Sequence, residues 1–180
     1  NAAIEISRIS NDLRLLSSGP TTGLYEIVLP AIAPGSSIMP GKVNPSIPEM
    51  VNMVCFQVIG SATTVDWAVG AGQMELNVMM PVMAHNTLTS IHILGSAARQ
   101  FADRCVAGIT VNEDACRRFA ESTLGLATAL NAHIGYKAAG EVAREALADG
   151  RTIIEVVREK GLLDDDRVAR IMDAKSMTEP

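Results

Sequence analysis

Apolar residues recur at helical spacing from the beginning of the chain. Three- and four-residue steps place them on one face of a helix, and the positions are Ile6, Ile9, Leu13 and Leu16. Gly19 and Pro20 then interrupt the pattern, as residues beyond a helix end commonly do. The spacing therefore predicts a helix over 2–17.

Two longer apolar helices are expected in the middle of the chain. The first begins near Pro48, with Glu49 in its first turn, and ends at the glycines around position 70. The second covers 73–104 and is apolar on nearly every face, which is typical of a helix buried in a large bundle. Pro81 is expected to kink this second helix.

The remainder of the chain, 108–180, reads as a small domain of short amphipathic helices. Its helix-end signals are Asn112 as a first-turn cap, Gly150 and Gly161 as stops, the capping-box pair Thr152 and Glu155, and Asp164 as a cap. The sequence therefore predicts an all-α protein. A long-helix bundle over 1–107 is followed by a small helical C-terminal domain over 108–180.

Composition supports helices and limits the possible partners. Aromatic residues make up 3% of the chain and apolar residues 48%, which favours helices packed on helices over a β-sandwich. Only 19% of residues are charged, so we expect other subunits to cover part of the surface. The net charge of −5 without a basic run argues against nucleic acid, and the apolar run around 74–94 is too polar for a membrane span.

The three cysteines and three histidines point away from redox or metal chemistry. Cys55, Cys105 and Cys116 are far apart and lack CxxC spacing, so free thiols in a reducing, cytoplasmic setting are expected. The histidines do not cluster with them, and no metal site is predicted.

The first residues carry no signal-peptide pattern, and they show helical periodicity at once without an initiator Met. We therefore expect the chain to be the C-terminal portion of a longer polypeptide.

A long irregular segment carries the candidate chemistry. Residues 21–48 hold five of the eight prolines, and a connection of this length inside a compact chain is usually functional. Within 33–49, Ser36 lies in a Gly-Ser-Ser turn whose N–H groups could stabilise an anion. Lys42 and Asn44, two residues apart, would point the same way in an extended segment and suit one carboxylate. An anion-binding loop with a possible base and a solvated surface loop both remain open at this point.

The stretch GSSIMPGKVNP resembles the signature of the fumarase/aspartase superfamily, G-S-x-x-M-x-x-K-x-N. Each fixed position matches, namely Gly35, Ser36, Met39, Lys42 and Asn44. Further stretches, including NDLRLLSSGP, AGQMELNVMMPV and LNAHIGY, resemble class II fumarases and aspartate ammonia-lyases. The resemblance covers essentially the whole chain and is to the C-terminal part of such an enzyme, with the signature loop at 33–49.

The resemblance implies roles for particular residues. Ser36 matches the general base that removes a proton next to a substrate carboxylate, in a loop that closes over the substrate. Ser37, Lys42 and Asn44 match the substrate-binding residues, while Gly35 and Met39 are further loop positions. Glu49 matches an acid that orients a catalytic-site histidine from a segment outside this chain.

The resemblance also implies a small dicarboxylate substrate, no cofactor, and a homotetramer whose active sites combine segments of three subunits. The 180-residue piece alone is therefore expected to be inactive. Conversion of L-aspartate to fumarate and ammonia is favoured, and a class II fumarate hydratase acting on malate is the alternative. Thr21 and Met80 depart from residues common in the family and weaken only this choice. A helical assembly module without activity is the alternative from another class.

Overall fold

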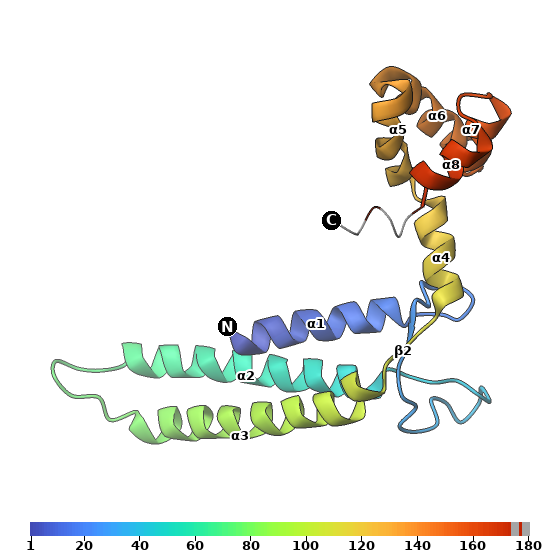
Figure 1. The fold of residues 1–180 in the computed structure, drawn as a ribbon. Coiled ribbons are helices and arrows are strands. Elements are labelled where there is room, and N and C mark those ends of the chain that lie inside the picture. The colour runs from blue at the N-terminus through green and yellow to red at the C-terminus, as the bar shows by residue number, and fades with distance from the viewer. Residues whose placement is uncertain (174–176, 178–180) are drawn as a thin grey trace. The chain divides into compact units, whose positions relative to one another are not determined.

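The computed structural model describes residues 1–173 and 177, and it divides the chain into two compact units, Asn1–Asn112 and Glu113–Pro180. Both units are built mainly of helices, as the sequence predicts (Figure 1). None of the helices in the described part of the chain is long and apolar enough to cross a membrane.

Three long helices form the first unit. They are α1 (Ala2–Leu16), α2 (Ser46–Gly70) and α3 (Met80–Arg104), with α2 packed against both α1 and α3 (Figure 1). A short 3₁₀ turn, Val106–Gly108, follows α3. The helices share a core of buried apolar side chains. Its buried members are Ala3, Leu29, Val51, Cys55, Ala97, Phe101 and Cys105.

A two-residue β-ladder ties the irregular segment to the end of the first unit. Strand β1 (Ile27–Val28) pairs antiparallel with β2 (Thr110–Val111), and the Asn112 N–H donates to the Glu26 carbonyl at 2.9 Å. This pairing holds 108–112 on the first unit. The first compact unit consequently ends at Asn112.

The prediction for the second long helix was wrong at its beginning. Residues 73–79 form a turn, and α3 begins at Met80. The Asn77 side chain accepts a hydrogen bond from the Met79 N–H at 2.9 Å and donates to the Ala68 carbonyl at 3.0 Å, which fastens the turn to α2. Pro81 therefore lies in the first turn, where proline fits without a kink, and the predicted kink is absent for that reason.

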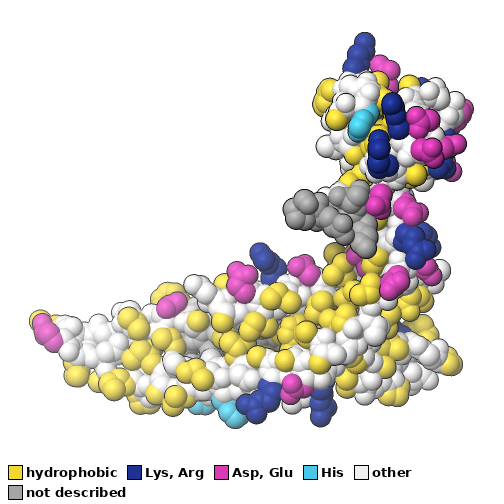
Figure 2. All heavy atoms as spheres, viewed as in Figure 1, with side chains coloured by type: hydrophobic (Ala, Val, Ile, Leu, Met, Phe, Trp, Pro, Cys, Tyr) yellow, Lys and Arg dark blue, Asp and Glu magenta, His cyan; other side chains and the backbone are white. Residues whose placement is uncertain are grey.

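The expectation that this helix is buried on all sides is also wrong for the chain by itself. Only Ala97 and Phe101 of α3 are buried, whereas Leu88 and Ile91 are 67% and 66% exposed. Hydrophobic side chains lie along the visible face of the three helices (Figure 2). The described segments of the first unit leave these faces open.

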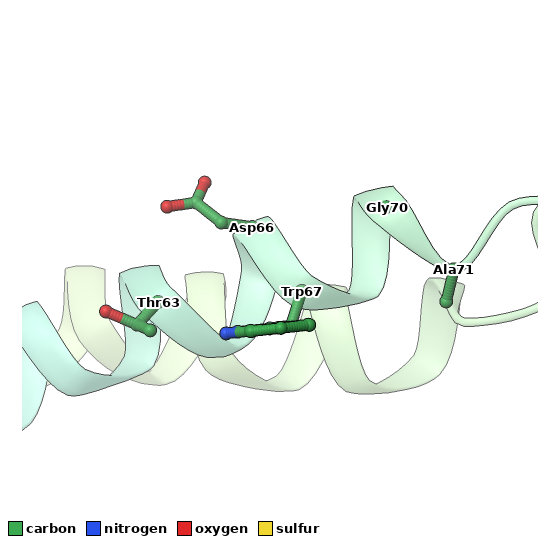
Figure 3. A pocket seen from close by; sticks show the side chains of 5 residues that line it. All are labelled: Thr63, Asp66, Trp67, Gly70 and Ala71. Carbon is green, nitrogen blue, oxygen red and sulfur yellow. The ribbon is translucent and has the colours of Figure 1, made fainter.

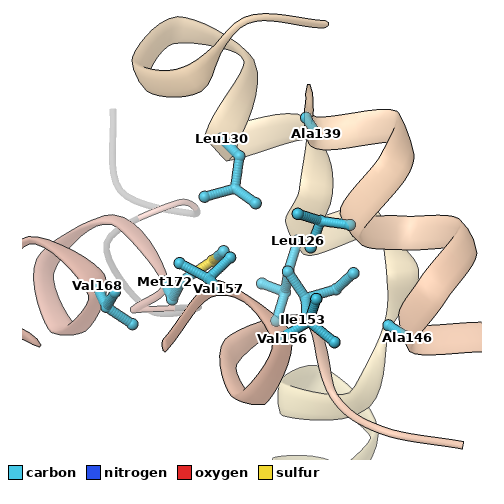
Figure 4. Close-up of a cluster of buried hydrophobic side chains, with 10 residues drawn as sticks. Leu126, Leu130, Ala139, Ala146, Ile153, Val156, Val157, Val168 and Met172 are labelled. Atoms are coloured by element: carbon cyan, nitrogen blue, oxygen red, sulfur yellow. The ribbon is translucent and has the colours of Figure 1, made fainter. Parts of the chain in front are cut away.

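The second unit contains α4 (Glu113–Ser122), a 3₁₀ turn (Leu124–Leu126), and four further helices. These are α5 (Ala127–Ile134), α6 (Tyr136–Asp149), α7 (Ile153–Glu159) and α8 (Asp165–Ile171). It has its own apolar core, centred on Leu130, Ile153 and Val156 (Figure 4). The predicted capping box of Thr152 and Glu155 is present, Asp164 caps α8, and Gly150 ends α6 in the left-handed region.

Candidate active-site loop

The signature loop, 33–49, runs from the stem after β1 into the first turn of α2. Its two sides are joined where the Gly35 N–H donates to the Lys42 carbonyl and the Asn44 amide donates to the Gly35 carbonyl, each at 2.9 Å. We call Gly35, Lys42 and Asn44 the loop neck. A Cβ on Gly35 would lie 2.4 Å from the Lys42 carbonyl oxygen, so only glycine allows the two backbone segments of the neck to approach this closely.

The hydroxyl of Ser36 lies just beyond the neck and is stabilised as a hydrogen-bond acceptor. Its Oγ accepts from the N–H groups of Ile38 and Met39, each at 3.1 Å. Hydrogen bonds donated to an oxygen favour its anionic form, because they stabilise negative charge more than they stabilise the neutral group. This turn therefore gives the half-buried Ser36 a means of acting as a base.

Ser36 and Lys42 line the same open hollow, which has a volume of about 300 Å³. Its other lining residues are Ala31, Ile32, Ala33, Pro34, Gly35, Met39, Gly41 and Val43. Lys42 is the only charged residue between positions 31 and 48, and its exposed ammonium group makes no ion pair with a described residue. An unneutralised cation beside a polarised hydroxyl suits a small anionic molecule.

The structure gathers some of the predicted site residues and separates others. Gly35, Ser36, Met39 and Lys42 are the predicted site residues that line the hollow.

 The Asn44 amide is directed at the Gly35 carbonyl and so serves the loop neck. Ser37 is exposed outside the hollow, and Glu49 lies half-buried in the first turn of α2.

A buried polar network, which the sequence analysis did not predict, anchors the first turn of α2. The Ser10 hydroxyl, fully buried on α1, donates to the Pro48 carbonyl at 2.8 Å, next to Glu49. Asn52 donates to the Ser7 hydroxyl at 2.8 Å and accepts from Arg14 at 3.3 Å. These contacts join residues far apart in the chain, so no short sequence pattern predicts them.

A second hollow, of about 540 Å³, lies at the other end of α2 (Figure 3). It is lined by Thr63, Asp66, Trp67, Gly70 and Ala71, and Asp66 points away from the Trp67 ring. Its polar groups do not converge on one point, so the loop hollow is the better candidate for chemistry.

The histidines and cysteines do not assemble into a site in the part of the chain that the structure describes. His85, His92 and His133 are exposed, and no group of three or more metal-ligating side chains occurs among the described residues. Burial raises the pKa of the Cys55 and Cys105 thiols, which keeps them protonated and unreactive.

Two family models match the chain. A lyase family model matches residues 1–60, and a model of the fumarase C C-terminus matches residues 126–179. Aspartate ammonia-lyases from Pseudomonas canavaninivorans and Pseudomonas fluorescens are each 52% identical over 178 residues, which is 99% of this chain. The chain spans 38% and 37% of the lengths of these two relatives.

Solved structures agree with these matches. A fumarate lyase:delta crystallin from Brucella melitensis has a TM-score of 0.94 at 51% identity, covering 99% of this chain and 39% of that one. A class II fumarase from Schistosoma mansoni has a TM-score of 0.91 at 40% identity, covering 99% and 37%. The fold is thus that of the helical fumarate lyases. Within this class, the chain fits the C-terminal portion of a member of the fumarase/aspartase superfamily.

Proposed function

We propose that the chain is part of an aspartate ammonia-lyase, which converts L-aspartate to fumarate and ammonia. The observation that carries this proposal is the signature loop, in which a serine oxygen that accepts two N–H bonds lies in one hollow with a lysine that pairs with none of the described residues. The similarity to aspartate ammonia-lyases at 52% identity supports the choice of substrate.

In the proposed reaction, Ser36 acts as the base. Its oxygen, in the anionic form that the two N–H bonds favour, takes a proton from the carbon next to one substrate carboxylate and becomes a neutral hydroxyl. The electron pair of the broken C–H bond moves into that carboxylate. The doubly charged carboxylate then returns this pair to form the C=C bond of fumarate, while the C–N bond of the substrate's ammonium group breaks with its electrons on nitrogen and ammonia leaves. Donors aimed at the doubly charged carboxylate lower the barrier, because the charge develops there.

Other residues of the loop bind the substrate in this proposal. Lys42 and Asn44 provide a cation and an amide donor for one carboxylate; the Asn44 amide has two N–H groups, so one can bind the substrate while the other keeps its bond to the Gly35 carbonyl. Ser37 contributes a further hydroxyl from the same turn. Glu49 orients a histidine supplied by another segment, and its place beside the anchored Pro48 carbonyl supports a fixed orientation.

The proposal extends to assembly and location. The first unit is the end of a central helical lyase domain, the second is a small C-terminal domain, and the exposed apolar faces of α2 and α3 are covered by other subunits of a homotetramer. The 180 residues alone are then inactive. The buried free thiols Cys55 and Cys105 support a reducing, cytoplasmic location.

A class II fumarase is the second candidate, supported by the similarity to the Schistosoma mansoni enzyme at 40% identity. The proposed chemistry is the same, with water as the leaving group. A helical assembly module without activity has less support, because assembly alone gives no reason for Ser36, Lys42 and Asn44 to share one loop.

The test uses the full-length gene product that carries these residues, with the 180-residue chain measured beside it. L-Aspartate and L-malate are offered separately, and fumarate is followed by its ultraviolet absorbance. We expect fumarate from aspartate alone, and none from the 180-residue chain. Ser36→Ala is expected to lower kcat by about 10²- to 10⁴-fold, the usual contribution of a general base.

Ser122→Ala is the matched control, because Ser122 lies in the second unit and has an exposed hydroxyl that donates to the nearby Phe119 carbonyl. It is expected to keep the parent kcat. Fumarate from malate alone would favour the fumarase instead. Full activity in Ser36→Ala would contradict the proposed base, and turnover by the 180-residue chain would contradict the shared active site.

A further inference from the structure

The end of the signature loop that follows β1 is held by the segment after α3. β1 pairs with β2, and Leu29, the residue after β1, is buried in the same core as Phe101 and Cys105. Pro30 then leaves this core and begins the stem, residues 30–34, which leads to Gly35 and Ser36. The position of Pro30 therefore sets where the stem starts.

Gly108 lies against the ring of Pro30, with no room for a side chain. A Cβ at Gly108 would be 2.5 Å from Pro30 Cγ and 3.6 Å from its Cβ. The φ of Gly108 is outside the left-handed region, so the backbone conformation does not require glycine there. The residue is also exposed, so core packing does not require it either. The close approach of Pro30 is what requires a glycine.

A side chain at this position would displace the stem. Carbon atoms in contact lie about 3.5–4.0 Å apart, so the Pro30 ring would have to move by about 1 Å. Proline has a fixed φ, and its ring carries the backbone with it. Beside the contact is an open hollow of about 510 Å³, lined by Pro30, Ala31, Ile32, Asp103, Arg104, Ala107 and Gly108, so little resists this movement.

We infer that Gly108 is a positioning residue for the signature loop: by admitting the Pro30 ring, it fixes the stem that aligns Ser36. The consequence for catalysis rests on the proposed function. Misplacement of a reacting group by about 1 Å can cost on the order of 10²-fold in rate. Gly35 and Ser36 continue the chain directly from the stem, so a movement of the stem strains the bonds of Gly35 to Lys42 and Asn44 and displaces Ser36.

The experiment compares four forms of the full-length gene product. They are the parent, Gly108→Ala, Pro30→Ala, and the double variant Gly108→Ala/Pro30→Ala, in which the atom that Gly108→Ala would strike is gone. Gly140→Ala is the control, because a Cβ there meets nothing within 4 Å. Two readouts are taken: turnover of L-aspartate, and amide hydrogen exchange of the Gly35 N–H in the loop neck.

We expect Gly108→Ala to lower kcat by about 10- to 100-fold while KM changes by less than about threefold, because alignment of the base is lost more than binding. The acidic limb of the pH profile of kcat/KM should move to higher pH, since Ser36 loses well-placed N–H donors. Exchange at Gly35 should rise. The double variant should return both readouts to those of Pro30→Ala, and Gly140→Ala should match the parent.

The outcomes separate this inference from the proposed function. Unchanged Gly35 exchange in Gly108→Ala overturns the positioning role, whether or not the parent is active. Equal loss of kcat in the single and double variants overturns it as well, because relief of the contact then restores nothing. A parent that turns over neither aspartate nor malate, with Gly35 exchange raised in Gly108→Ala and restored in the double variant, overturns the proposed function and upholds the positioning role.

Discussion

At the scale of single residues, Asn52 shows how a buried amide is satisfied between two helices. Its side chain is 3% exposed. Its Nδ2 donates to the Ser7 carbonyl at 3.1 Å and to the Ser7 hydroxyl at 2.8 Å, while its Oδ1 accepts from Arg14. A buried polar group without partners is costly, so this network fixes α2 on α1 in one register.

Asn52→Ala is expected to lower the free energy of unfolding by about 1–3 kcal/mol, because it removes the amide that donates to the buried Ser7 hydroxyl. Urea unfolding of the 180-residue chain, followed by circular dichroism, measures the change. Asn11→Ala is the control, since Asn11 is exposed and also accepts from Arg14. Its expected effect is within about 0.5 kcal/mol, and equal losses in both variants would contradict the role of the buried network.

The sequence pattern indicates which residues of the loop are candidates for chemistry, and it does not indicate which distant residues hold the loop. The residue types at Gly35, Ser36 and Lys42 have a fixed local spacing, so a pattern can indicate them. The contacts of Gly108 with Pro30, and of Ser10 with Pro48, join segments that come together only in the folded chain. Sequence spacing carries no information about them.

At the scale of elements, local signals placed the helix ends well where side chains form caps. Thr152, Asp164 and Gly150 act within a few residues of their own position, so the sequence suffices. The start of α3 was missed because the apolar pattern continues through 73–79, although Asn77 fastens that stretch to α2 as a turn. Hydrophobic periodicity cannot distinguish these two states.

An ion pair links the second unit's α6 to the end of α7 and makes its stability depend on pH. Lys160 donates a hydrogen bond to Glu145 at 2.6 Å, which lowers the pKa of Glu145, and Arg151 adds a second bond at 3.0 Å. A carboxyl whose pKa is lowered by folding stabilises the fold above its ordinary value of 4.5. This stabilisation is lost as the pH falls through the lowered pKa.

Glu145→Gln is therefore expected to reduce stability at neutral pH. It should also make unfolding less sensitive to acid below pH 4.5, the ordinary pKa of a glutamate side chain. Urea midpoints of the 180-residue chain, measured over a pH series, test this. Glu121→Gln is the control, because Glu121 is exposed on α4. If the parent and Glu145→Gln have parallel pH curves, the ion pair contributes nothing to the acid dependence.

At the scale of the whole molecule, the exposed apolar face of α3 is the feature for which the prediction of burial was wrong for the chain by itself. Apolar residues all round a helix predict burial, but the described segments of the first unit cover only part of it. Met53 and Phe56 on α2 are 63% and 60% exposed, in addition to Leu88 and Ile91 on α3. A pattern indicates that a surface is to be covered, and it does not say which chain covers it.

Leu88→Lys in the full-length gene product is expected to reduce its mass in solution below that of the parent assembly. Burial of a leucine side chain contributes about 1.5–3 kcal/mol, and a lysine there adds the cost of burying a charge. Sedimentation equilibrium measures the mass. Leu147→Lys on α6 is the control, because Leu147 is 69% exposed and lies in the second unit. A parent mass in Leu88→Lys would contradict the proposed interface.

The exposed ring of Trp67, at the end of α2 beside the hollow of Figure 3, has a practical consequence. It is the sole tryptophan of these 180 residues and is 79% exposed. Indole fluorescence is emitted at longer wavelength in water than in an apolar environment. The emission maximum of the 180-residue chain therefore reports, without any attached dye, whether that end of the helix is wet or covered.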